Sequence, residues 1–409
     1  RAVDAALVVE GTAVRIEPER IGTVVDEEAA TAQVLGALEG LEPVAMELPT
    51  QVEQPAIYAA DLQNAQSQLT QALAQPMIAQ FEDQEWALDP ATLSRFITTD
   101  AVRNGDGVNV QMAMNHNEMT EWLRQTYSGL VNRTPSDATV AWQAGEGLVA
   151  LTPSVSGATL RSNAFAEQVE QSFFGDQASI EIPVVVTAPE IDSNNLAAMK
   201  INSMLGRGDS YYGGQQWDRD HNVELGAQMM SGELIAPGEE FSFNEAVGDI
   251  TASAGYVDAG VIVAEQATRG VGGGICQVST TVFRAALFTG MPITDWEPHT
   301  ARLGIYENDG WAAGFDASII QIGSDRSQWG DFRFRNDTGG YVLVQSWTSY
   351  PHVIVEIFGN DDGRTVEVGD PQLWGSGQDL EALVPRTVTY ANGDVREAEF
   401  FSRYRQADS

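Results

Sequence analysis

The sequence predicts an α+β protein, with two related α/β modules followed by a β-rich domain that is built around one main helix. Three observations support this prediction. A strand–turn–strand pattern followed by an amphipathic helix occurs twice, beginning at Asp4 and at Asp137. The second half contains one strong helical pattern, residues 277–288, which Gly290 ends. Most other segments of that half alternate polar and apolar residues between Gly, Asp and Asn turns, which is typical of strands.

The two repeats match in their turn residues as well as in their periodicity. Pro18 and Gly22 of the first repeat correspond to Pro153 and Gly157 of the second. We therefore expect two modules, 1–130 and 131–199. A helix-rich insert with one short strand, GVNVQMAM, is expected within the first module, from about residue 62 to 133.

The main domain is expected at residues 200–362. Residues 203–222 are rich in Gly and Asp, and we expect them to form an irregular connection. A C-terminal β-hairpin extension, 363–409, is predicted from two strand patterns that flank an Asn-Gly-Asp turn at residues 392–394.

The composition excludes several classes of function. The chain has 22 basic and 58 acidic residues and a net charge of −36, so it repels nucleic-acid phosphates and no nucleic-acid partner is expected. No run of eighteen apolar residues occurs. Because the sequence begins with Arg1, we expect that a signal peptide or N-terminal anchor has been lost. An anchor of this kind is the only membrane contact expected.

Cys276 is the only cysteine in the chain, and its surroundings favour a reactive thiol over a packed one. It follows three consecutive glycines, Gly272, Gly273 and Gly274, and lies at the predicted start of the main helix. Free backbone N–H groups and the helix dipole at this position lower the pKa of a thiol. The same groups, from Gly274 to Gln277, are expected to bind an oxyanion.

A thiol nucleophile requires a base, and the chain has four histidines. His299 follows Cys276 by 23 residues, which allows one helix and a return to its start. His221, in a polar segment, is the competing candidate. Asp316, at the start of a predicted strand, is the candidate acid that orients the base. No histidine pair or calcium loop occurs, so we expect neither a metal nor another cofactor.

Five segments resemble the signature blocks of the VanW family, in the same order and with natural spacing: PGEEFSFNEAVG, AGYVDAG, GGGICQVSTTVFRAAL, EPHTARLGIY and GFDASI. The upstream segment RDHN is similar to an Arg–Asn block of that family. The approach to the Asp316 block is longer and less regular than in the family pattern. The two repeats resemble the peptidoglycan-binding modules that precede VanW domains and L,D-transpeptidase domains of the YkuD type.

The resemblance implies a cell-wall L,D-transpeptidase that uses Cys276 as nucleophile, with peptidoglycan stem peptides and glycan as partners and a location outside the cytoplasm. The alternatives are a non-catalytic peptidoglycan-binding protein and a cysteine hydrolase or carboxypeptidase. The catalytic residues expected are Cys276, His299 and Asp316. The substrate- or oxyanion-binding residues expected are Gly272, Gly273, Gly274, Gln277, Ser279, Thr280, Arg219, Asn222 and His221.

Overall fold

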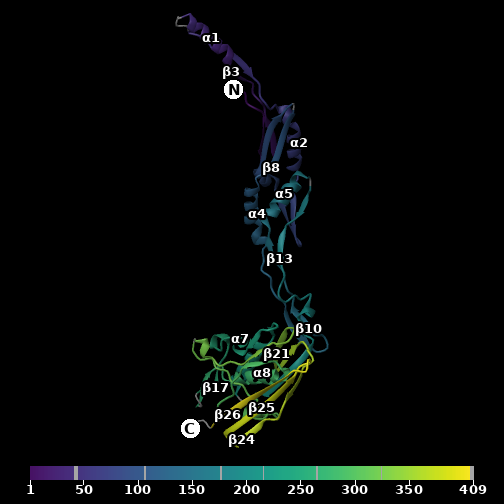
Figure 1. Ribbon diagram of the computed structural model, residues 1–409, viewed down its shortest axis with the longest axis vertical. Coiled ribbons are helices and arrows are strands. Elements are labelled where there is room, and N and C mark those ends of the chain that lie inside the picture. The colour runs from purple at the N-terminus through teal and green to yellow at the C-terminus, as the bar shows by residue number, and fades with distance from the viewer. Residues whose placement is uncertain are drawn as a thin grey trace. The chain divides into compact units, whose positions relative to one another are not determined.

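The computed structural model describes residues 1–40, 45–105, 107–175, 177–214, 216–263, 266–323 and 325–405 of the 409-residue chain. Helices and strands are interspersed along it (Figure 1), which confirms the predicted α+β class. None of the helices in these ranges combines the length and the apolar character needed to cross a bilayer.

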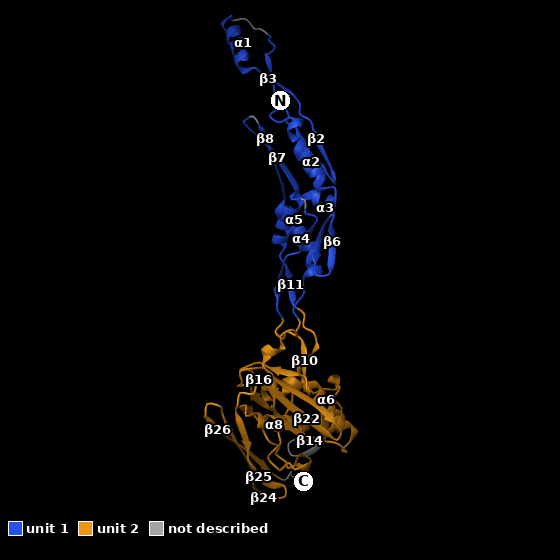
Figure 2. Cartoon of the chain, turned by 90° about the vertical axis from the view of Figure 1, so that its right-hand side faces the viewer, with its two compact units in different colours: residues 1–135, 156–188 blue, residues 136–155, 189–409 orange. Residues whose placement is uncertain are grey.

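The chain folds into two compact units (Figure 2). Unit 1 comprises Arg1–Pro135 and Ser156–Ala188, and unit 2 comprises Ser136–Val155 and Pro189–Ser409. The last four residues of the predicted extension, 406–409, lie outside the described residues.

This division differs from the segments expected from the sequence, because residues 131–199 do not form a body of their own. Ala138 and Val140 are buried in one hydrophobic cluster with Leu343 and Phe358 of the main domain. Trp142 also stacks on Phe358, with 4.9 Å between ring centroids. Because its apolar side chains are buried against the main domain, the hairpin that begins the second repeat belongs to unit 2.

Each repeat consists of a hairpin, a strand, a helix and a strand that pairs with the strand before the helix. The first repeat has β1 (Ala6–Glu10), β2 (Ala13–Glu17), β3 (Gly22–Val25), α1 (Glu27–Glu39) and β4 (Thr50–Glu53). The second has β9 (Thr139–Gln143), β10 (Gly147–Thr152), β11 (Gly157–Leu160), α5 (Ser162–Phe174) and β13 (Val184–Thr187). The antiparallel pairs are β1–β2 and β3–β4 in the first repeat, and β9–β10 and β11–β13 in the second.

The repeats also share a side-chain contact. Asp4 Oδ1 accepts hydrogen bonds from the backbone N–H groups 52 and 53 residues further along the chain. Asp137 Oδ1 accepts them from the groups 53 and 54 residues further along. The aspartate that begins each sequence repeat therefore ties the start of the repeat to its end.

The insert in the first module is mixed rather than helix-rich, which corrects the expectation. Its elements are η1 (Ala59–Leu62), α2 (Gln63–Ala72), β5 (Met77–Phe81), β6 (Gln84–Leu88), α3 (Pro90–Leu93), η2 (Ser94–Phe96), β7 (Ile97–Asn104), β8 (Gly107–Met114) and α4 (His116–Val131). β8 is the predicted strand, and it pairs with β7 along its whole length. A lone strand would leave its backbone N–H and C=O groups unpaired. Downstream, β12 (Ser179–Glu181) pairs with β5 in parallel.

The centre of unit 2 is a four-stranded antiparallel sheet with the order β14-β22-β21-β15. Its strands are β14 (Ser203–Tyr211), β15 (Glu233–Ile235), β21 (Val342–Ser349) and β22 (His352–Gly359). The helix α8 (Cys276–Thr289) packs on β14 and β22, and α6 (Trp217–Met230) packs mainly on β21.

The predicted irregular connection at 203–222 is therefore wrong: apart from Gln215, which lies outside the described residues, it forms β14, a short turn and the start of α6. The glycines of β14 serve packing. A Cβ on Gly206 would lie 2.2 Å from the carbonyl O of Ala285, and one on Gly208 would lie 2.3 Å from that of Thr281. Only glycine allows α8 to approach this strand so closely.

Short elements surround this centre. They are η3 (Leu196–Met199), β16 (Glu240–Ser242), α7 (Phe243–Val247), η4 (Ala252–Ala254), β17 (Asp258–Val263), β18 (Gln266–Val271), β19 (Ile293–Asp295), η5 (Gly304–Glu307), η6 (Arg326–Gln328) and β20 (Arg333–Arg335).

The C-terminal segment is a four-stranded sheet and not a hairpin. The two predicted strands are β25 (Asp379–Thr389) and β26 (Val395–Tyr404), and β25 also pairs with β23 (Thr365–Val368) and β24 (Gln372–Ser376). Val384 and Phe400 of this sheet belong to the main hydrophobic core of unit 2. The segment is thus part of the main domain.

Candidate active site

Cys276 is the first residue of α8, as the sequence predicts, and a turn of three glycines leads the chain to it. Gly272 and Gly274 have φ angles of +83° and +111°, which residues with a Cβ rarely adopt. A Cβ on Gly273 would lie 2.5 Å from the carbonyl O of Gly260. Backbone geometry alone therefore requires all three glycines.

Hydrogen bonds within this turn limit which backbone N–H groups are free to bind an oxyanion. The N–H of Ile275 donates to Gly272 O at 3.1 Å, and that of Gln277 donates to Gly274 O at 2.9 Å. These two donors are already paired. Among the four N–H groups expected to bind an oxyanion, those of Gly274 and Cys276 remain candidates.

His299, and not His221, is the histidine beside the thiol. The Cys276 thiol is partly buried, within hydrogen-bonding range of the His299 imidazole and 3.7 Å from the carbonyl O of Ile319. His221 is exposed on α6, and its Nε2 lies 3.0 Å from the carbonyl O of Gly255. The structure thus decides between the two histidines that the sequence left open.

Asp316 holds the imidazole from the opposite side. Its Oδ2 lies 2.7 Å from His299 Nδ1 and accepts a second hydrogen bond, at 2.9 Å, from the backbone N–H of His299. Because Nδ1 is engaged with the carboxylate, Nε2 is the nitrogen left to act on the thiol. Cys276, His299 and Asp316 therefore lie together in the order expected of a thiol nucleophile, a base and an orienting acid.

The pKa values of the thiol and the imidazole are shifted toward an ion pair. Burial raises the pKa of Cys276, but the hydrogen bond with His299 and the charge of His299 outweigh it and keep this pKa below its ordinary value. Burial lowers the pKa of His299, but the hydrogen bonds with Asp316 and Cys276 outweigh it and raise this pKa. Both directions favour thiolate and imidazolium, the reactive form of a cysteine nucleophile.

Two buried tyrosines complete the surroundings of the imidazole, and sequence reasoning missed both. The hydroxyl of Tyr404, on β26, donates to Asp316 Oδ1. The ring of Tyr306, on η5, stacks on that of His299 with 4.7 Å between centroids, and its hydroxyl lies 3.3 Å from Nε2.

Arg284, on α8, is a third missed residue and is almost completely buried. Its guanidinium donates to three backbone carbonyls: Asp209 at 2.7 Å, Tyr306 at 2.5 Å and Phe315 at 3.0 Å. Burial lowers its pKa to about 10, so it stays charged near neutral pH. Arg284 therefore fixes the segments that carry Tyr306 and Asp316 to the main helix. The sequence did contain a signal for this residue, because Arg284 is an arginine within an otherwise apolar helical pattern.

Arg219 reaches the same turn from α6. Its Nη2 donates to Gln277 Oε1 at 3.0 Å, and its Cγ would lie 2.9 Å from a Cβ on Gly274. Its positive charge also lowers the pKa of Cys276. Arg219 and Gln277 thus contact each other, and Arg219 lies near enough to the thiol to lower its pKa; their role in binding stays a prediction.

Three other predicted site residues hold the scaffold. Asn222 is fully buried and donates at 2.9 Å to the carbonyls of Val257 and Gly273, which fixes the glycine turn. Ser279 and Thr280 are also fully buried, and their hydroxyls donate to the carbonyl O of Ala317, at 2.7 and 3.2 Å. These bonds tie the segment that carries Asp316 to α8; this segment is irregular, so the expectation that Asp316 begins a strand is wrong.

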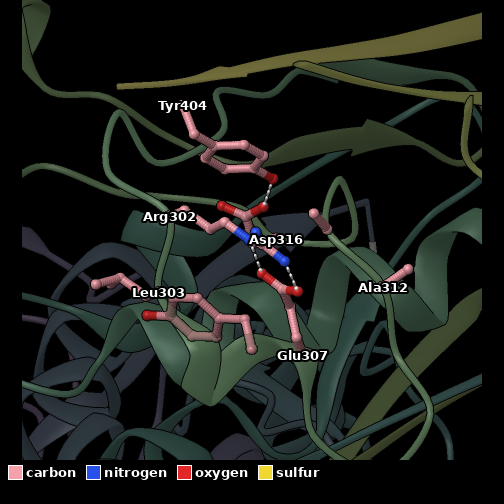
Figure 3. Close-up of a pocket in the computed structure, with 8 residues that line it drawn as sticks. Arg302, Leu303, Glu307, Ala312, Asp316 and Tyr404 are labelled. Atoms are coloured by element: carbon pink, nitrogen blue, oxygen red, sulfur yellow. Dashed lines mark hydrogen bonds and ion pairs between the residues drawn. The ribbon is translucent and has the colours of Figure 1, made fainter. Parts of the chain in front are cut away.

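A small pocket adjoins the acid end of this series (Figure 3). Arg302 and Glu307 form a two-point ion pair in its wall, with N–O distances of 2.7 and 2.6 Å. Asp316 and Tyr404 lie next to this pair. Among the described residues, no group of three or more His, Cys, Asp or Glu side chains is placed to hold a metal ion.

Comparisons with known proteins place this site in a family. Residues 218–358 match the family model described as "VanW like protein". The uncharacterized protein YoaR of Bacillus subtilis is 32% identical over 214 residues, which cover 52% of this chain and 66% of YoaR. The vancomycin B-type resistance protein VanW of Enterococcus faecalis is 32% identical over 134 residues, 33% of this chain and 46% of that protein.

The matched part of the chain thus spans just under two thirds of one relative and about half of the other. No solved structure matches the chain significantly. The resemblance of the N-terminal repeats to peptidoglycan-binding modules stays a prediction. Cys276, His299, Asp316, Arg219 and Gln277 all lie inside the matched residues. The chain therefore carries a VanW-like domain, formed by residues 218–358.

Proposed function

We propose that the VanW-like domain is a cell-wall acyltransferase, an L,D-transpeptidase that cross-links peptidoglycan stem peptides through a thioester on Cys276. One observation carries this proposal: the only thiol of the chain begins a helix beside His299, which Asp316 holds through two hydrogen bonds. A residue that serves only to fill the core needs no such partners. The printed name of one relative, which links that protein to vancomycin resistance, agrees with a role at the cell wall.

In the first half-reaction, the thiolate attacks the carbonyl carbon of the third stem residue, a diamino acid. A sulfur–carbon bond forms and a tetrahedral oxyanion develops on the carbonyl oxygen. When the oxyanion collapses, the bond to the nitrogen of the terminal D-residue breaks. The imidazolium of His299 gives its proton to that nitrogen, and the D-residue leaves as a free amino acid.

In the second half-reaction, the side-chain amine of a neighbouring stem attacks the thioester. His299, now neutral, accepts a proton from this amine as the nitrogen–carbon bond forms. The sulfur–carbon bond breaks and the thiolate returns. Asp316 stabilises the imidazolium in both halves and keeps its proton-transferring Nε2 toward the sulfur.

On this proposal the protein acts outside the cytoplasm, where cross-linked peptidoglycan is made. In this proposal the two N-terminal repeats bind the glycan–peptide mesh or set the distance from an N-terminal anchor. The catalytic work belongs to unit 2, which contains every residue that we assign to chemistry.

The test is to incubate the protein with disaccharide-tetrapeptides and to measure cross-linked dimers by mass spectrometry. Wild type and His221→Ala should form dimers, whereas Cys276→Ala should form none and keep the circular-dichroism spectrum of wild type. Release of the terminal residue without dimers would identify a carboxypeptidase. Binding without any product, or full activity of Cys276→Ala, would contradict the proposal.

A further inference from the structure

Two buried N–H donors beside the thiol have no acceptor among the described residues: Arg219 Nη1 and Gln277 Nε2. Gln277 is completely buried. A buried donor that makes no hydrogen bond costs folding free energy, so native proteins rarely retain one without a reason. The pair therefore points to a ligand that supplies acceptors.

The charge of Arg219 favours an anion as the ligand of these donors. Arg219 Nη2 donates to Gln277 Oε1 at 3.0 Å, and the opposite orientation of the amide would set two donors against each other. The guanidinium thus fixes Gln277 Nε2 as a donor that is aimed elsewhere. A full positive charge and two spare donors on side chains in contact suit the two oxygens of a carboxylate.

The charges around Arg219 strengthen this argument. Two other arginines of unit 2 are paired with carboxylates: Arg269 with Asp218 at 2.6 Å, and Arg302 with Glu307 at 2.6 Å. Among the described residues, Arg219 forms no ion pair. Arg219 thus keeps a positive charge that no carboxylate pairs with directly, and this charge acts on the Cys276 thiol.

The position of the donors suggests which anion they take. Gln277 follows Cys276 directly, and Arg219 packs against Gly274 in the same turn. Successive residues of a peptide are only about 3.8 Å apart. An anionic group one residue beyond the attacked carbonyl would therefore lie beside this turn. The terminal carboxylate occupies that place in a donor whose last residue is the leaving group.

We propose that Arg219 and Gln277 bind the free carboxylate of the donor's terminal residue, so that the enzyme acts on peptides that end one residue after the attacked carbonyl. Arg219 Nη1 and Gln277 Nε2 donate to its two oxygens. This inference rests on the proposed function and deepens it, because it assigns the residues that recognise the terminal carboxylate of the donor.

The test compares two donors, the disaccharide-tetrapeptide with a free terminal carboxylate and the same compound with a terminal amide. Wild type should prefer the acid roughly 100-fold in kcat/KM, as expected for a charge-assisted pair of hydrogen bonds. Arg219→Gln should abolish most of this preference. Gln277→Glu should do the same, because the new carboxylate pairs with Arg219 and removes the Nε2 donor. The matched control is Arg207→Gln, which removes an exposed arginine that pairs with Glu356 on the central sheet.

Binding to the Cys276→Ala protein, measured by calorimetry with the tetrapeptide acid and its amide, gives a readout that is independent of turnover. The acid should bind more tightly, and Arg219→Gln in the same background should remove the difference. The carboxylate site would be overturned if wild type used both donors with equal kcat/KM. It would also be overturned if the variants lost kcat/KM by the same factor with both donors. Either result would leave the transferase proposal intact. Absence of an acyl-enzyme with either donor would overturn both.

Discussion

At the scale of single residues, the reactivity of Cys276 depends on His299. Burial disfavours a thiolate, and the hydrogen bond and charge of the imidazole reverse that effect. The imidazole in turn keeps its proton through Asp316, whose second carboxylate oxygen accepts the Tyr404 hydroxyl. The thiol, the imidazole, the carboxylate and the phenol thus form one polarised series in a partly buried site.

The first prediction concerns this dependence. Because the pKa of Cys276 is lowered, native protein should react with iodoacetamide at a lower pH than unfolded protein, whose thiol has the ordinary pKa of about 8.5. The rate should fall as the pH drops below the lowered pKa. His299→Ala should move the labelling curve to higher pH, and His221→Ala should leave it unchanged. Labelling is followed by mass against unfolded protein; identical curves for native and unfolded protein would refute the activated thiol.

The second prediction concerns Tyr404, a positioning residue. Tyr404→Phe removes the hydrogen bond that helps to hold the pKa of Asp316 down, so the carboxylate supports the imidazolium less well. The labelling curve of Cys276 should shift to higher pH, and turnover should fall about tenfold. Tyr390→Phe is the matched control, since Tyr390 donates to Asp337 at 3.1 Å away from the thiol. A lower turnover with an unmoved labelling curve would mean that Tyr404 acts only on packing.

The sequence singles out Cys276 by its local pattern, offers Asp316 as the orienting acid and leaves two histidines, His299 and His221, as candidates for the base. It does not identify Tyr306, Tyr404 or Arg284, since their importance depends on contacts made by folding. Tyr404 lies 88 residues after Asp316, on a strand beyond the residues that match the family. The choice between His299 and His221 also required the fold, because composition and spacing allow either histidine to be the base.

At the scale of elements, the position of the thiol depends on how closely α8 packs on β14. The carbonyls of Thr281 and Ala285 occupy the space that a Cβ on Gly208 or Gly206 would fill. The sequence misled us here, because glycines usually indicate loops. In β14 the absence of side chains on the glycines lets a helix pack closely against the strand. This role can be recognised only when the position of the helix is known.

The third prediction tests this packing. Gly208→Ala places a Cβ 2.3 Å from Thr281 O, so the helix or the strand must shift. We expect a loss of about 1–3 kcal/mol in the stability of unit 2 and a lower midpoint of thermal unfolding. The control is Gly339→Ala, because a Cβ on Gly339 meets no atom within 4 Å. Equal midpoints for the two variants would show that the strand and helix are not closely packed there.

At the scale of the whole molecule, both the repeats and the charge were accessible from sequence, whereas the division into units was not. The turn residues of the repeats are local signals, and both repeats form the same series of strands and helix. The boundary between the units runs through the second repeat, because its hairpin is buried against Leu343 and Phe358. Contacts across some 200 residues of sequence leave no local signal.

The fourth prediction follows from the net charge of −36. Repulsion among the excess carboxylates destabilises the folded state, and salt screens it. The midpoint of thermal unfolding near pH 7 should therefore rise between low ionic strength and about 0.5 M sodium chloride, a range over which the Debye length falls to a few ångströms. A midpoint that falls with added salt would mean that specific ion pairs outweigh the general repulsion.

The central claim is that Cys276 forms a thioester with a peptidoglycan donor, and intact-mass spectrometry tests it most directly. Wild-type protein is mixed with the disaccharide-tetrapeptide alone, without an acceptor, and quenched in acid. We expect an adduct whose added mass equals that of the donor minus the free terminal amino acid, which maps to Cys276 and is absent from Cys276→Ala. If the thiol alkylates at a lower pH than in unfolded protein and yet no adduct forms, or if the adduct persists in Cys276→Ala, the account is wrong.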